Sequence, residues 1–369
     1  MYGVLILNTN SESIDFSNIK TQLNNWAQTL GFQRCGVASV HVGQHAQHLQ
    51  NWLAQHFHAD MTYMERHADL RCDPTALLPG TLRIIMVRMN YWPNASDAWQ
   101  QLNTPNQAYI ARYALGRDYH KLMRKRLTQL AKQLENHIGS FGYRAFVDSA
   151  PVLEKALAEQ AGLGWIGKHT LLIDRQQGSY FFLGALFTDL PLPLDDSTTS
   201  HCGSCSACLD ICPTKAIVAP YQLDARKCIA YLTIENKGPI PEAFRTAIGN
   251  RIFGCDDCQL ICPWNKFAQL TAELDFTPRH QLDRITLLEL FCWSEADYLK
   301  NTEGSPIRRT GYIGWLRNLA IGLGNAPAHP DIITALEQRQ NIQPDWLAEH
   351  VTWALQRQRL CSAQLPPFA

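Results

Sequence analysis

The feature that most constrains the fold of this 369-residue chain is a group of eight cysteines between positions 202 and 262. The first run, HCGSCSACLDICP, has the spacing C-x2-C-x2-C-x3-C and ends at Pro213. The second run, GCDDCQLICP, has the spacing C-x2-C-x3-C and ends at Pro263, and Cys228 stands alone between the runs. Thiolates are soft ligands, so spacing of this kind indicates a metal centre rich in sulfur.

The spacing is typical of bacterial two-cluster ferredoxins, with one cysteine displaced. In that pattern the fourth cysteine of each run binds the other cluster. The sequence therefore predicts a ferredoxin-like module with two [4Fe–4S] clusters and four ligands to each. The ligands of cluster 1 would be Cys202, Cys205, Cys208 and Cys262, and those of cluster 2 would be Cys212, Cys228, Cys255 and Cys258.

Zinc and disulfides are the weaker explanations of these cysteines. Structural zinc also uses paired C-x2-C motifs, but it takes four thiolates and has no use for a third cysteine at the next two-residue step. Disulfide frameworks belong to small secreted scaffolds rather than to a chain of this length. The remaining cysteines are expected to be core or surface thiols, and they are Cys35, Cys72, Cys292 and Cys361.

Length and composition predict two or three domains with ample material for packed cores, since 46% of the residues are hydrophobic. The formal net charge is zero, so nucleic-acid binding would need a local basic patch. The start MYGVLILNTNSE lacks the features of a signal peptide, and no window reaches the roughly 20 apolar residues of a membrane span. We therefore expect a cytoplasmic protein without membrane contact, where thiols stay reduced.

Three regions of different character follow one another, which predicts an α+β or α/β multidomain protein. Residues 12–195 alternate helical and strand-like segments, among them a helix that ends at Gly31 and a buried strand at 84–87. After the linker PLPLDDSTTS, residues 196–275 hold the cysteines. Residues 276–369 have a helical pattern only, which suggests a short HEAT- or armadillo-like repeat that depends on its neighbour for stability.

Asp148, at the end of the strand-like segment YRAFVD, has two interpretations. An aspartate followed by Pro151 and a helical segment is an N-cap signature, and N-caps are the commoner case. The end of a strand before a helix is also where α/β proteins place active groups. The glycine-rich loop GLGWIGKHT, with Lys168 and His169, could be a plain turn or a close approach to a ligand with a phosphate.

Two segments carry local positive charge, and each could be either a solvated helix face or a footprint for RNA phosphates. The segment RYALGRDYHKLMRKRL contains Arg112, Arg117, Lys121, Arg124, Lys125 and Arg126. The segment IRRTGYIGWLRN contains Arg308, Arg309, Arg317 and Asn318.

Several longer segments closely resemble epoxyqueuosine reductases, and together they span roughly residues 15–360. They include LRCDPTALLPG, DSAPVLEKALAEQAGLGWIGKHTLLI, GSYFFLGALFTDLPL, CGSCSACLDICPTKAI, CIAYLTIENKGPIP, GNRIFGCDDCQLICPWN and RRTGYIGWLRNLAIGLGN. The resemblance implies a monomeric oxidoreductase that depends on cobalamin and iron–sulfur clusters. Such an enzyme reduces epoxyqueuosine to queuosine at the wobble position of tRNA, the last step of queuosine biosynthesis. A flavodoxin or ferredoxin system is the implied kind of electron donor.

The resemblance also implies roles for particular regions and residues. The N-terminal region would be a nitroreductase-like cobalamin-binding domain, and the C-terminal helices would help to hold the tRNA through Arg308, Arg309, Arg317 and Asn318. Asp148 would be the proton donor, and burial is expected to raise its pKa. The residues that fall in segments around the cobalamin are Arg71, Asp148, Lys168, His169, Leu172, Ser179 and Asp256.

This chain differs from two sequence patterns of related proteins, and each difference bears on a role near the cobalamin. The string from Asp118 to His120 lacks the glycine of a D-x-H-x-x-G signature, since Met123 stands there, so we expect a base-off cobalamin without a histidine ligand from that motif. Some family members have a cysteine where this chain has Ala111, which puts a thiol role there in doubt.

Two other functions stay open on the sequence. A reductive dehalogenase would share the cobalamin domain and the clusters, but it would not need the basic helical tail and usually carries an export signal. An electron-transfer ferredoxin joined to an RNA-binding module would need no cobalamin.

Overall fold

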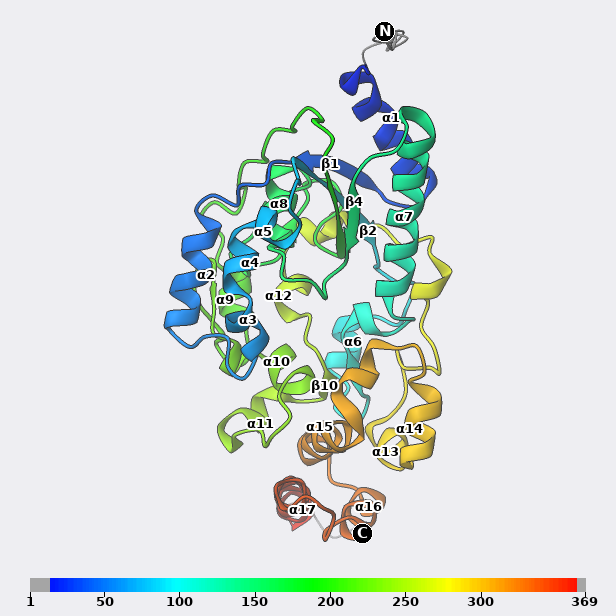
Figure 1. The fold of residues 1–369 in the computed structure, drawn as a ribbon. Coiled ribbons are helices and arrows are strands. Elements are labelled where there is room, and N and C mark those ends of the chain that lie inside the picture. Colours follow the sequence, from blue (N-terminus) through cyan, green and yellow to red (C-terminus); the bar gives the residue numbers. More distant parts are fainter. Residues whose placement is uncertain (1–13, 364–369) are drawn as a thin grey trace, which may run out of the picture.

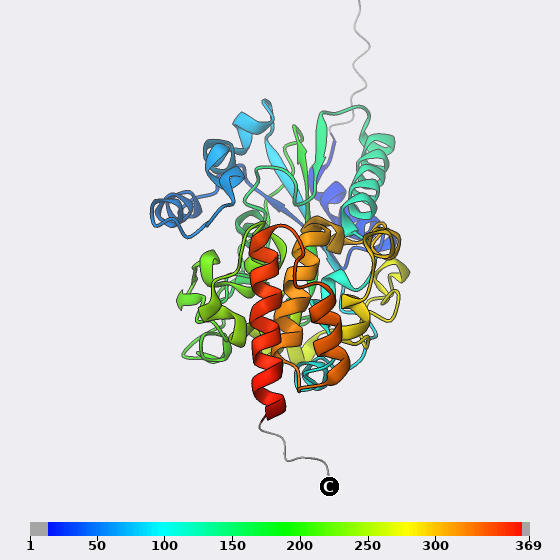
Figure 2. The same ribbon diagram turned by 90° about the horizontal axis from the view of Figure 1, so that it is seen from below.

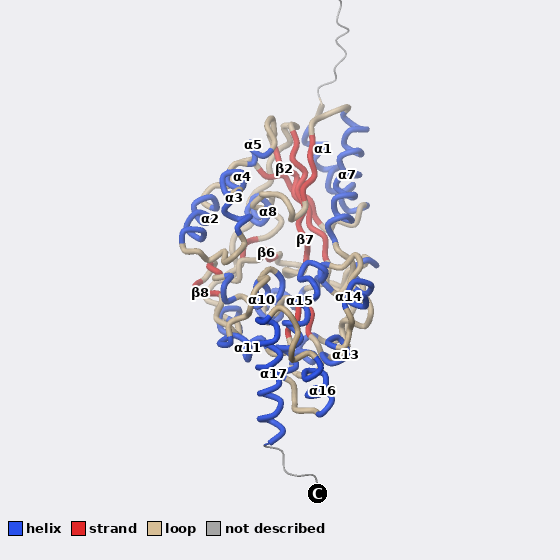
Figure 3. The backbone as a smooth tube through the Cα atoms, turned by 60° about the horizontal axis from the view of Figure 1, so that its bottom comes forward, coloured by secondary structure: helices blue, strands red, loops and turns tan. Residues whose placement is uncertain are grey.

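The centre of the N-terminal region is a four-stranded sheet with the strand order β1-β2-β7-β4. The computed structural model describes residues 14–363. The strands, drawn red in Figure 3, are β1 (Arg34–Ala38), β2 (Arg83–Asn90), β7 (Phe181–Thr188) and β4 (Tyr143–Phe146). All three pairings are antiparallel, so this region is α+β rather than α/β. The alternation of helices and strands along the chain did not distinguish the two, because strand direction depends on the path of the connections.

Helices cover both faces of the sheet because its central strands alternate their side chains between two cores. Ile85 and Val87 of β2 pack with α1 (Phe16–Thr29) and α7 (Tyr119–Ile138), whereas Ile84 and Met86 pack on the opposite side with α8 (Glu154–Gln160). Figure 1 shows α1 and α7 side by side on one flank of the sheet and α8 on the other. The predicted end of the first helix is confirmed, since Gly31 follows α1 with a φ of 82°.

Several short elements complete this region and lead towards the cysteines. The helices are α2 (His45–Ala54), α3 (Thr62–Arg66), α4 (Ala68–Cys72), α5 (Pro74–Leu77) and α6 (Ala98–Leu102), with a 3-10 turn at Arg112–Ala114. The strands are β3 (Tyr109–Ile110), β5 (Trp165–Ile166) and β6 (Leu172–Ile173). Asp15 and Asp118 cap α1 and α7 through their carboxylates, as expected for N-cap aspartates.

The cysteine region consists of brief helices and strands joined by turns. These are α9 (Ala207–Ile211), β8 (Ile217–Ala219), β9 (Gln222–Leu223), α10 (Ile229–Ile234), α11 (Glu242–Ile248), β10 (Arg251–Phe253) and α12 (Asp257–Leu260). Three 3-10 turns lie at Ala225–Lys227, Pro263–Phe267 and Leu274–Phe276. Strand β10 pairs in parallel with β3, which ties this region to the N-terminal one.

The C-terminal region is helical, as the sequence predicts. It comprises α13 (Leu287–Phe291), α14 (Glu295–Asn301), a 3-10 turn at Pro306–Thr310, α15 (Gly311–Asn325), α16 (Pro330–Gln338) and α17 (Asp345–Ala363). Figure 2 shows α15, α16 and α17 packed side by side. Their buried residues share one hydrophobic core with residues of the 108–115 and 225–253 segments. Among residues 14–363, no helix is long and apolar enough to cross a lipid bilayer.

Arg317 and Asn318, predicted as tRNA contacts, lie in that shared core and are fully buried. Arg317 donates hydrogen bonds of 2.8, 2.9 and 2.6 Å to the carbonyls of Leu232, Asn236 and Gly238. Asn318 donates bonds of 2.8 Å to the carbonyls of Thr233 and Ile252. The prediction for these two side chains is therefore wrong, because neither reaches a surface on which RNA could lie. They fasten α15 to α10 and β10 instead.

We predict that Arg317→Met destabilises the protein strongly. The change leaves two buried carbonyls and the half-buried carbonyl of Gly238 without this donor, and each loss at a buried group costs about 1–3 kcal/mol. The apparent melting temperature of the purified protein should fall by at least about 5 °C. The exposed Arg308→Met is the matched control and should shift it by about 2 °C at most. Equal melting temperatures for Arg317→Met and wild type would contradict the anchoring role.

Candidate functional site

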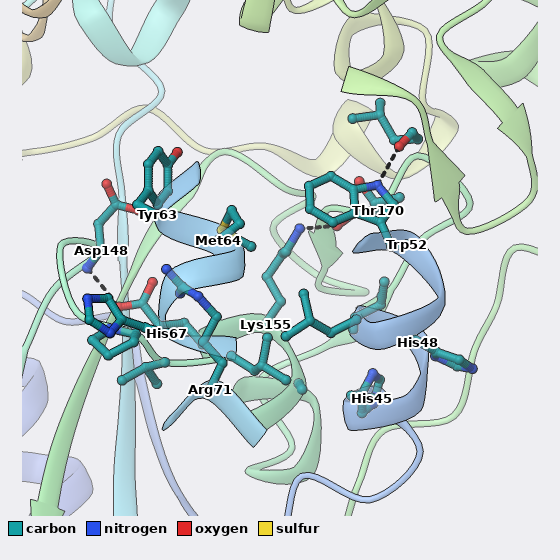
Figure 4. A pocket seen from close by; sticks show the side chains of 18 of the residues that line it. His45, His48, Trp52, Tyr63, Met64, His67, Arg71, Asp148, Lys155 and Thr170 are labelled. Atoms are coloured by element: carbon teal, nitrogen blue, oxygen red, sulfur yellow. Dashed lines mark hydrogen bonds between the residues drawn. The ribbon is translucent and has the colours of Figure 1, made fainter. Parts of the chain in front are cut away.

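A large cavity lies where the N-terminal region faces the cysteine and C-terminal regions. It has two connected parts, of about 780 Å³ and 1670 Å³, whose walls have in common Trp52, His120, Asp148, Ser149, Leu223 and Arg309. Figure 4 shows the smaller part, with Asp148 and Arg71 on one side and Lys155 and Trp52 on the other. A space of this size fits a large cofactor together with part of a substrate.

Asp148 is in the wall of both parts of the cavity and does not cap a helix. Helix α8 begins only at Glu154, with Leu153 as its N-cap residue, so the N-cap interpretation is wrong. Asp148 instead has a φ of 54°, in the left-handed region that aspartate tolerates better than most residues. Its side chain is 47% exposed. Backbone strain at a cavity wall is typical of functional positions.

His120, which sequence reasoning considered only as a failed cobalt ligand, contacts Asp148. Its Nδ1 lies 2.6 Å from Asp118 Oδ1 and its Nε2 lies 3.2 Å from Asp148 Oδ2. The hydrogen bonds to Asp118 and Asp148 raise the pKa of His120 to about 9. The imidazole is therefore protonated at neutral pH and donates through both nitrogens. The only sequence signal for this role was its position two residues after a helix-capping aspartate.

The pKa of Asp148 is lowered, whereas from the sequence we expected burial to raise it. The hydrogen bond from His120 lowers the pKa of Asp148, and this effect outweighs the opposing effect of burial. The backbone N–H of Asp148 donates to Glu154 Oε1 at 2.7 Å, and burial raises the pKa of Glu154 to about 8. The cavity wall thus holds a carboxylate, an imidazolium and a neutral carboxylic acid side by side, which is an arrangement suited to moving a proton.

Arg71 of α4, which the resemblance places near the cobalamin, also lines the cavity. It is 8% exposed, and its Nε has no hydrogen-bond partner among the described residues. A buried guanidinium with an unused donor needs an acceptor, and a polar or anionic group of a bound molecule would supply one.

The four cysteines predicted for cluster 1 surround a separate cavity of about 340 Å³. Burial and the nearby thiols of Cys262, Cys202 and Cys205 raise the pKa of Cys208 to about 11. Thiols that crowd together in this way resist ionisation unless a metal centre compensates their charge. The loop is fixed by Lys168, whose ammonium donates to the carbonyls of Gly203 and Cys205 at 2.7 and 2.8 Å.

The structure also brings together the four cysteines predicted for cluster 2. Burial and then the nearby thiol of Cys228 raise the pKa of Cys258, with a further contribution from Cys212. Cys255 adjoins the same group, and its thiol pKa is raised by burial and by Cys258 among other neighbours. The backbone N–H of Ala216 donates to Cys212 Sγ at 3.2 Å, a contact suited to a ligating thiolate. Cys228 also lines the larger part of the Asp148 cavity.

Five of the residues expected around the cobalamin lie elsewhere than in the walls of the Asp148 cavity. Lys168 and His169 line the cluster 1 cavity. Leu172 packs in the core beside α8. Ser179 bonds Asn265 and Gln259, and Asp256 accepts from Tyr109 Oη and the Arg112 N–H at 2.8 Å.

The two basic segments meet at the mouth of the larger part of the cavity. Its walls include Arg117, Lys121, Arg124, Lys125, Arg308 and Arg309. Arg309 pairs with Glu235 at 3.0 Å and faces Asp148. Two members of the first segment are excluded from this rim, because Arg112 is buried against Trp92 and Tyr109 and Arg126 pairs with Glu273.

Two family models match the chain. One, described as epoxyqueuosine reductase QueG, DUF1730, matches residues 71–149, and the other, a 4Fe-4S double cluster binding domain, matches residues 201–265. The first contains Arg71, His120 and Asp148. The second spans all eight cysteines of the two predicted clusters.

Curated relatives and solved structures are similar over nearly the whole chain. The epoxyqueuosine reductase of Pseudomonas aeruginosa is 58% identical over 344 residues, which is 93% of this chain and 95% of the relative. That of Escherichia coli is 53% identical over 348 residues, which is 94% of this chain and 92% of the relative. A crystal structure of epoxyqueuosine reductase with an epoxyqueuosine-modified tRNA-Tyr stem loop superposes with a TM-score of 0.86 at 26% identity, covering 93% of this chain and 91% of that one. The structure from Streptococcus thermophilus has a TM-score of 0.82 at 26% identity and covers 95% of both chains. This chain therefore belongs to the epoxyqueuosine reductase family of oxidoreductases.

Proposed function

We propose that the chain reduces epoxyqueuosine to queuosine at the wobble position of tRNA. The observation that carries this proposal is Asp148, bonded to a protonated His120, in a cavity whose mouth is basic. A related structure that superposes closely contains an epoxyqueuosine-modified tRNA stem loop, which fits a basic mouth. Removing the epoxide oxygen as water consumes two electrons and two protons, so the site needs both an electron relay and a proton donor.

The electron relay would be two [4Fe–4S] clusters bound by the two groups of cysteines. The grouped thiols with raised pKa and the match to a double-cluster domain support this assignment. Clusters of this type reach low reduction potentials and transfer single electrons. An electron donor such as a flavodoxin or ferredoxin would supply them.

A base-off cobalamin would occupy the cavity beside Asp148. The size of the cavity and the unpartnered Nε of buried Arg71 fit such a cofactor. Both ring nitrogens of His120 are engaged by carboxylates, which fits the expectation that this histidine is no cobalt ligand. When bound, cobalamin would supply the chemistry that opens the carbon–oxygen bond.

The proton donor would be Asp148 acting together with His120. As negative charge develops on the epoxide oxygen, the proton of the His120 imidazolium would pass to the Asp148 carboxylate and from there to that oxygen. Asp118 holds the imidazole in place through Nδ1 and stabilises its charge. Glu154 fixes the backbone at Asp148, so the acid stays aimed into the cavity.

The remaining expectations concern organisation and setting. The proposed parts are a nitroreductase-like cobalamin domain (12–195), the ferredoxin-like module (196–275) and a HEAT-like helical part (276–369) that helps to hold tRNA. The protein would act as a monomer in the cytoplasm.

An anaerobic assay of the purified chain on epoxyqueuosine-containing tRNA, with cobalamin and a strong reductant, tests the function. Absence of queuosine in the product tRNA would refute it.

The cluster assignment predicts about eight iron and eight sulfide per chain. Cys228→Ala should lose one cluster and keep about four iron, because only one group of ligands is incomplete. The exposed Cys292→Ser is the matched control and should keep the full content. Iron and sulfide analysis with EPR after anaerobic purification makes the measurement. Zinc in place of iron, or about four iron in the wild type, would contradict the assignment.

The proton-donor assignment predicts that Asp148→Asn turns over at least about 100-fold more slowly, because general acid catalysis is typically worth 10²–10⁴-fold. Asparagine also tolerates a positive φ, so the fold and the iron content should be retained. The exposed Asp196→Asn is the control and should react at the wild-type rate. Nearly normal turnover by Asp148→Asn would assign the proton to water or to another group.

The assignment of Asp148 and His120 as the proton donor also predicts how the turnover rate depends on pH. Because the pKa of His120 is raised to about 9, its proton is available below that pH and is lost above it. Wild-type turnover should therefore decline as the pH rises through about 9. His120→Gln should be slow and should lack this decline.

The basic mouth predicts that replacing Lys121, Lys125 and Arg308 together by glutamine weakens tRNA binding. The dependence of log affinity on log salt should become shallower, by roughly 0.7–0.9 for each phosphate whose charge the variant no longer neutralises. Lys132→Gln, on the same helix but away from the cavity, should bind like wild type. Binding of labelled tRNA over a range of salt concentrations makes the comparison. An unchanged slope in the triple variant would move the RNA surface elsewhere.

A further inference from the structure

His169 faces the cluster 1 cavity rather than the Asp148 cavity. Its side chain is 2% exposed and lines the same space as the four cysteines predicted to bind cluster 1. It belongs to a short loop that divides the two cavities. Ile166 and Thr170 of this loop line the Asp148 cavity, where Lys155 donates to the Thr170 carbonyl at 2.8 Å (Figure 4), while Lys168 and His169 line the cluster side.

The hydrogen bonds of His169 fix the position of its proton. The backbone N–H of Leu171 donates to His169 Nδ1 at 3.1 Å, so Nδ1 is the acceptor. In a neutral imidazole the other nitrogen, Nε2, must then carry the hydrogen. A nitrogen that accepts a hydrogen bond carries no hydrogen itself, so the contact with Leu171 holds the ring in its neutral Nε2–H form.

The Nε2–H of His169 is a buried donor without a partner among the described residues. Leaving such a donor unsatisfied costs free energy, so native structures supply an acceptor. Besides the four cysteines, the polar side chains that share its cavity are two lysines, the exposed His201 and Trp264, whose indole nitrogen can only donate. The lysines are only donors when charged, which leaves sulfur as the acceptor that the cavity offers in quantity.

We propose that His169 donates an N–H···S hydrogen bond to a sulfur of cluster 1 and thereby raises the reduction potential of that cluster. This inference rests on the proposed cluster ligands. Hydrogen bonds to the sulfurs are one of the factors that set iron–sulfur potentials. The added electron increases the negative charge on sulfur, so the bond is stronger in the reduced state. His169 is thus a tuning residue, placed on the wall between cluster 1 and the proposed cofactor site.

The test compares variants that keep or remove the donor. His169→Phe keeps a ring but has no N–H, and His169→Gln keeps an amide donor near the position of Nε2. The midpoint potential of cluster 1 is measured by redox titration with EPR in the full chain, and its signal is the one that survives in Cys228→Ala. His169→Phe should make reduction about tenfold less favourable, or about 59 mV lower for one electron. His169→Gln should restore most of the difference.

His201→Phe is the matched control. His201 lines the same cavity but is exposed, so water screens its effect and the potential should change little. A wild-type potential in His169→Phe with full iron would overturn the proposal, and so would an equal shift in the Phe and Gln variants.

A second measurement needs no variant and covers the case in which His169→Phe fails to bind iron. In protein labelled with ¹⁵N-histidine, pulsed EPR of the reduced cluster should detect a histidine nitrogen and an exchangeable proton coupled to cluster 1. Absence of this coupling would mean that water satisfies Nε2, and would overturn the proposal. Absence of any [4Fe–4S] signal would instead refute the proposed clusters, so the two failures are distinguishable.

Discussion

Arg317 and Asn318 make buried hydrogen bonds to the backbone of the cysteine region, and these bonds hold helix α15 in a fixed position against α10 and β10. The two side chains together bond five carbonyls, which belong to α10, to the loop after it and to β10. Cys228 immediately precedes α10, and Cys255 follows β10 by two residues. The turn that carries Arg308 and Arg309 leads directly into α15. One polar contact inside an apolar core therefore positions two of the proposed cluster ligands and two arginines of the cavity mouth.

Burying polar side chains costs free energy unless their donors and acceptors are hydrogen-bonded. Here most of the N–H donors of Arg317 and Asn318 have an acceptor. Of the Arg317 nitrogens, Nη1 and Nη2 bond carbonyls and Nε bonds the amide oxygen of Asn318. A well-satisfied buried network favours one arrangement of the helices over alternatives of similar hydrophobicity. This specificity matters where short helices and strands carry metal ligands and have little core of their own.

The ionisable side chains in the wall of the Asp148 cavity have different charge states. Asp118 and Asp148 stabilise the imidazolium of His120, while burial keeps Glu154 neutral next to them. On the other side of the dividing loop, the N–H of Leu171 donates to His169 Nδ1, which leaves the ring neutral with Nε2 as a fixed donor. Two histidines of the same chain thus have opposite protonation states at neutral pH. Their neighbours cause this difference, and it supports the proposed transfer of a proton by His120 and the proposed contact of His169 with sulfur.

The sequence by itself determined the chemistry that local patterns encode. Cysteine spacing predicted two groups of four thiols, apolar periodicity and Gly31 predicted α1 and its end, and longer motifs identified the family. Tertiary structure decided which side chains share a space. It buried Arg317 and Asn318, joined Lys121 and Arg308 at one mouth, paired His120 with Asp148 and turned His169 towards the cysteines. Spacing along the chain fixes local geometry, whereas burial, side-chain direction and pKa depend on neighbours that are distant in sequence, and these are set only when the chain has folded.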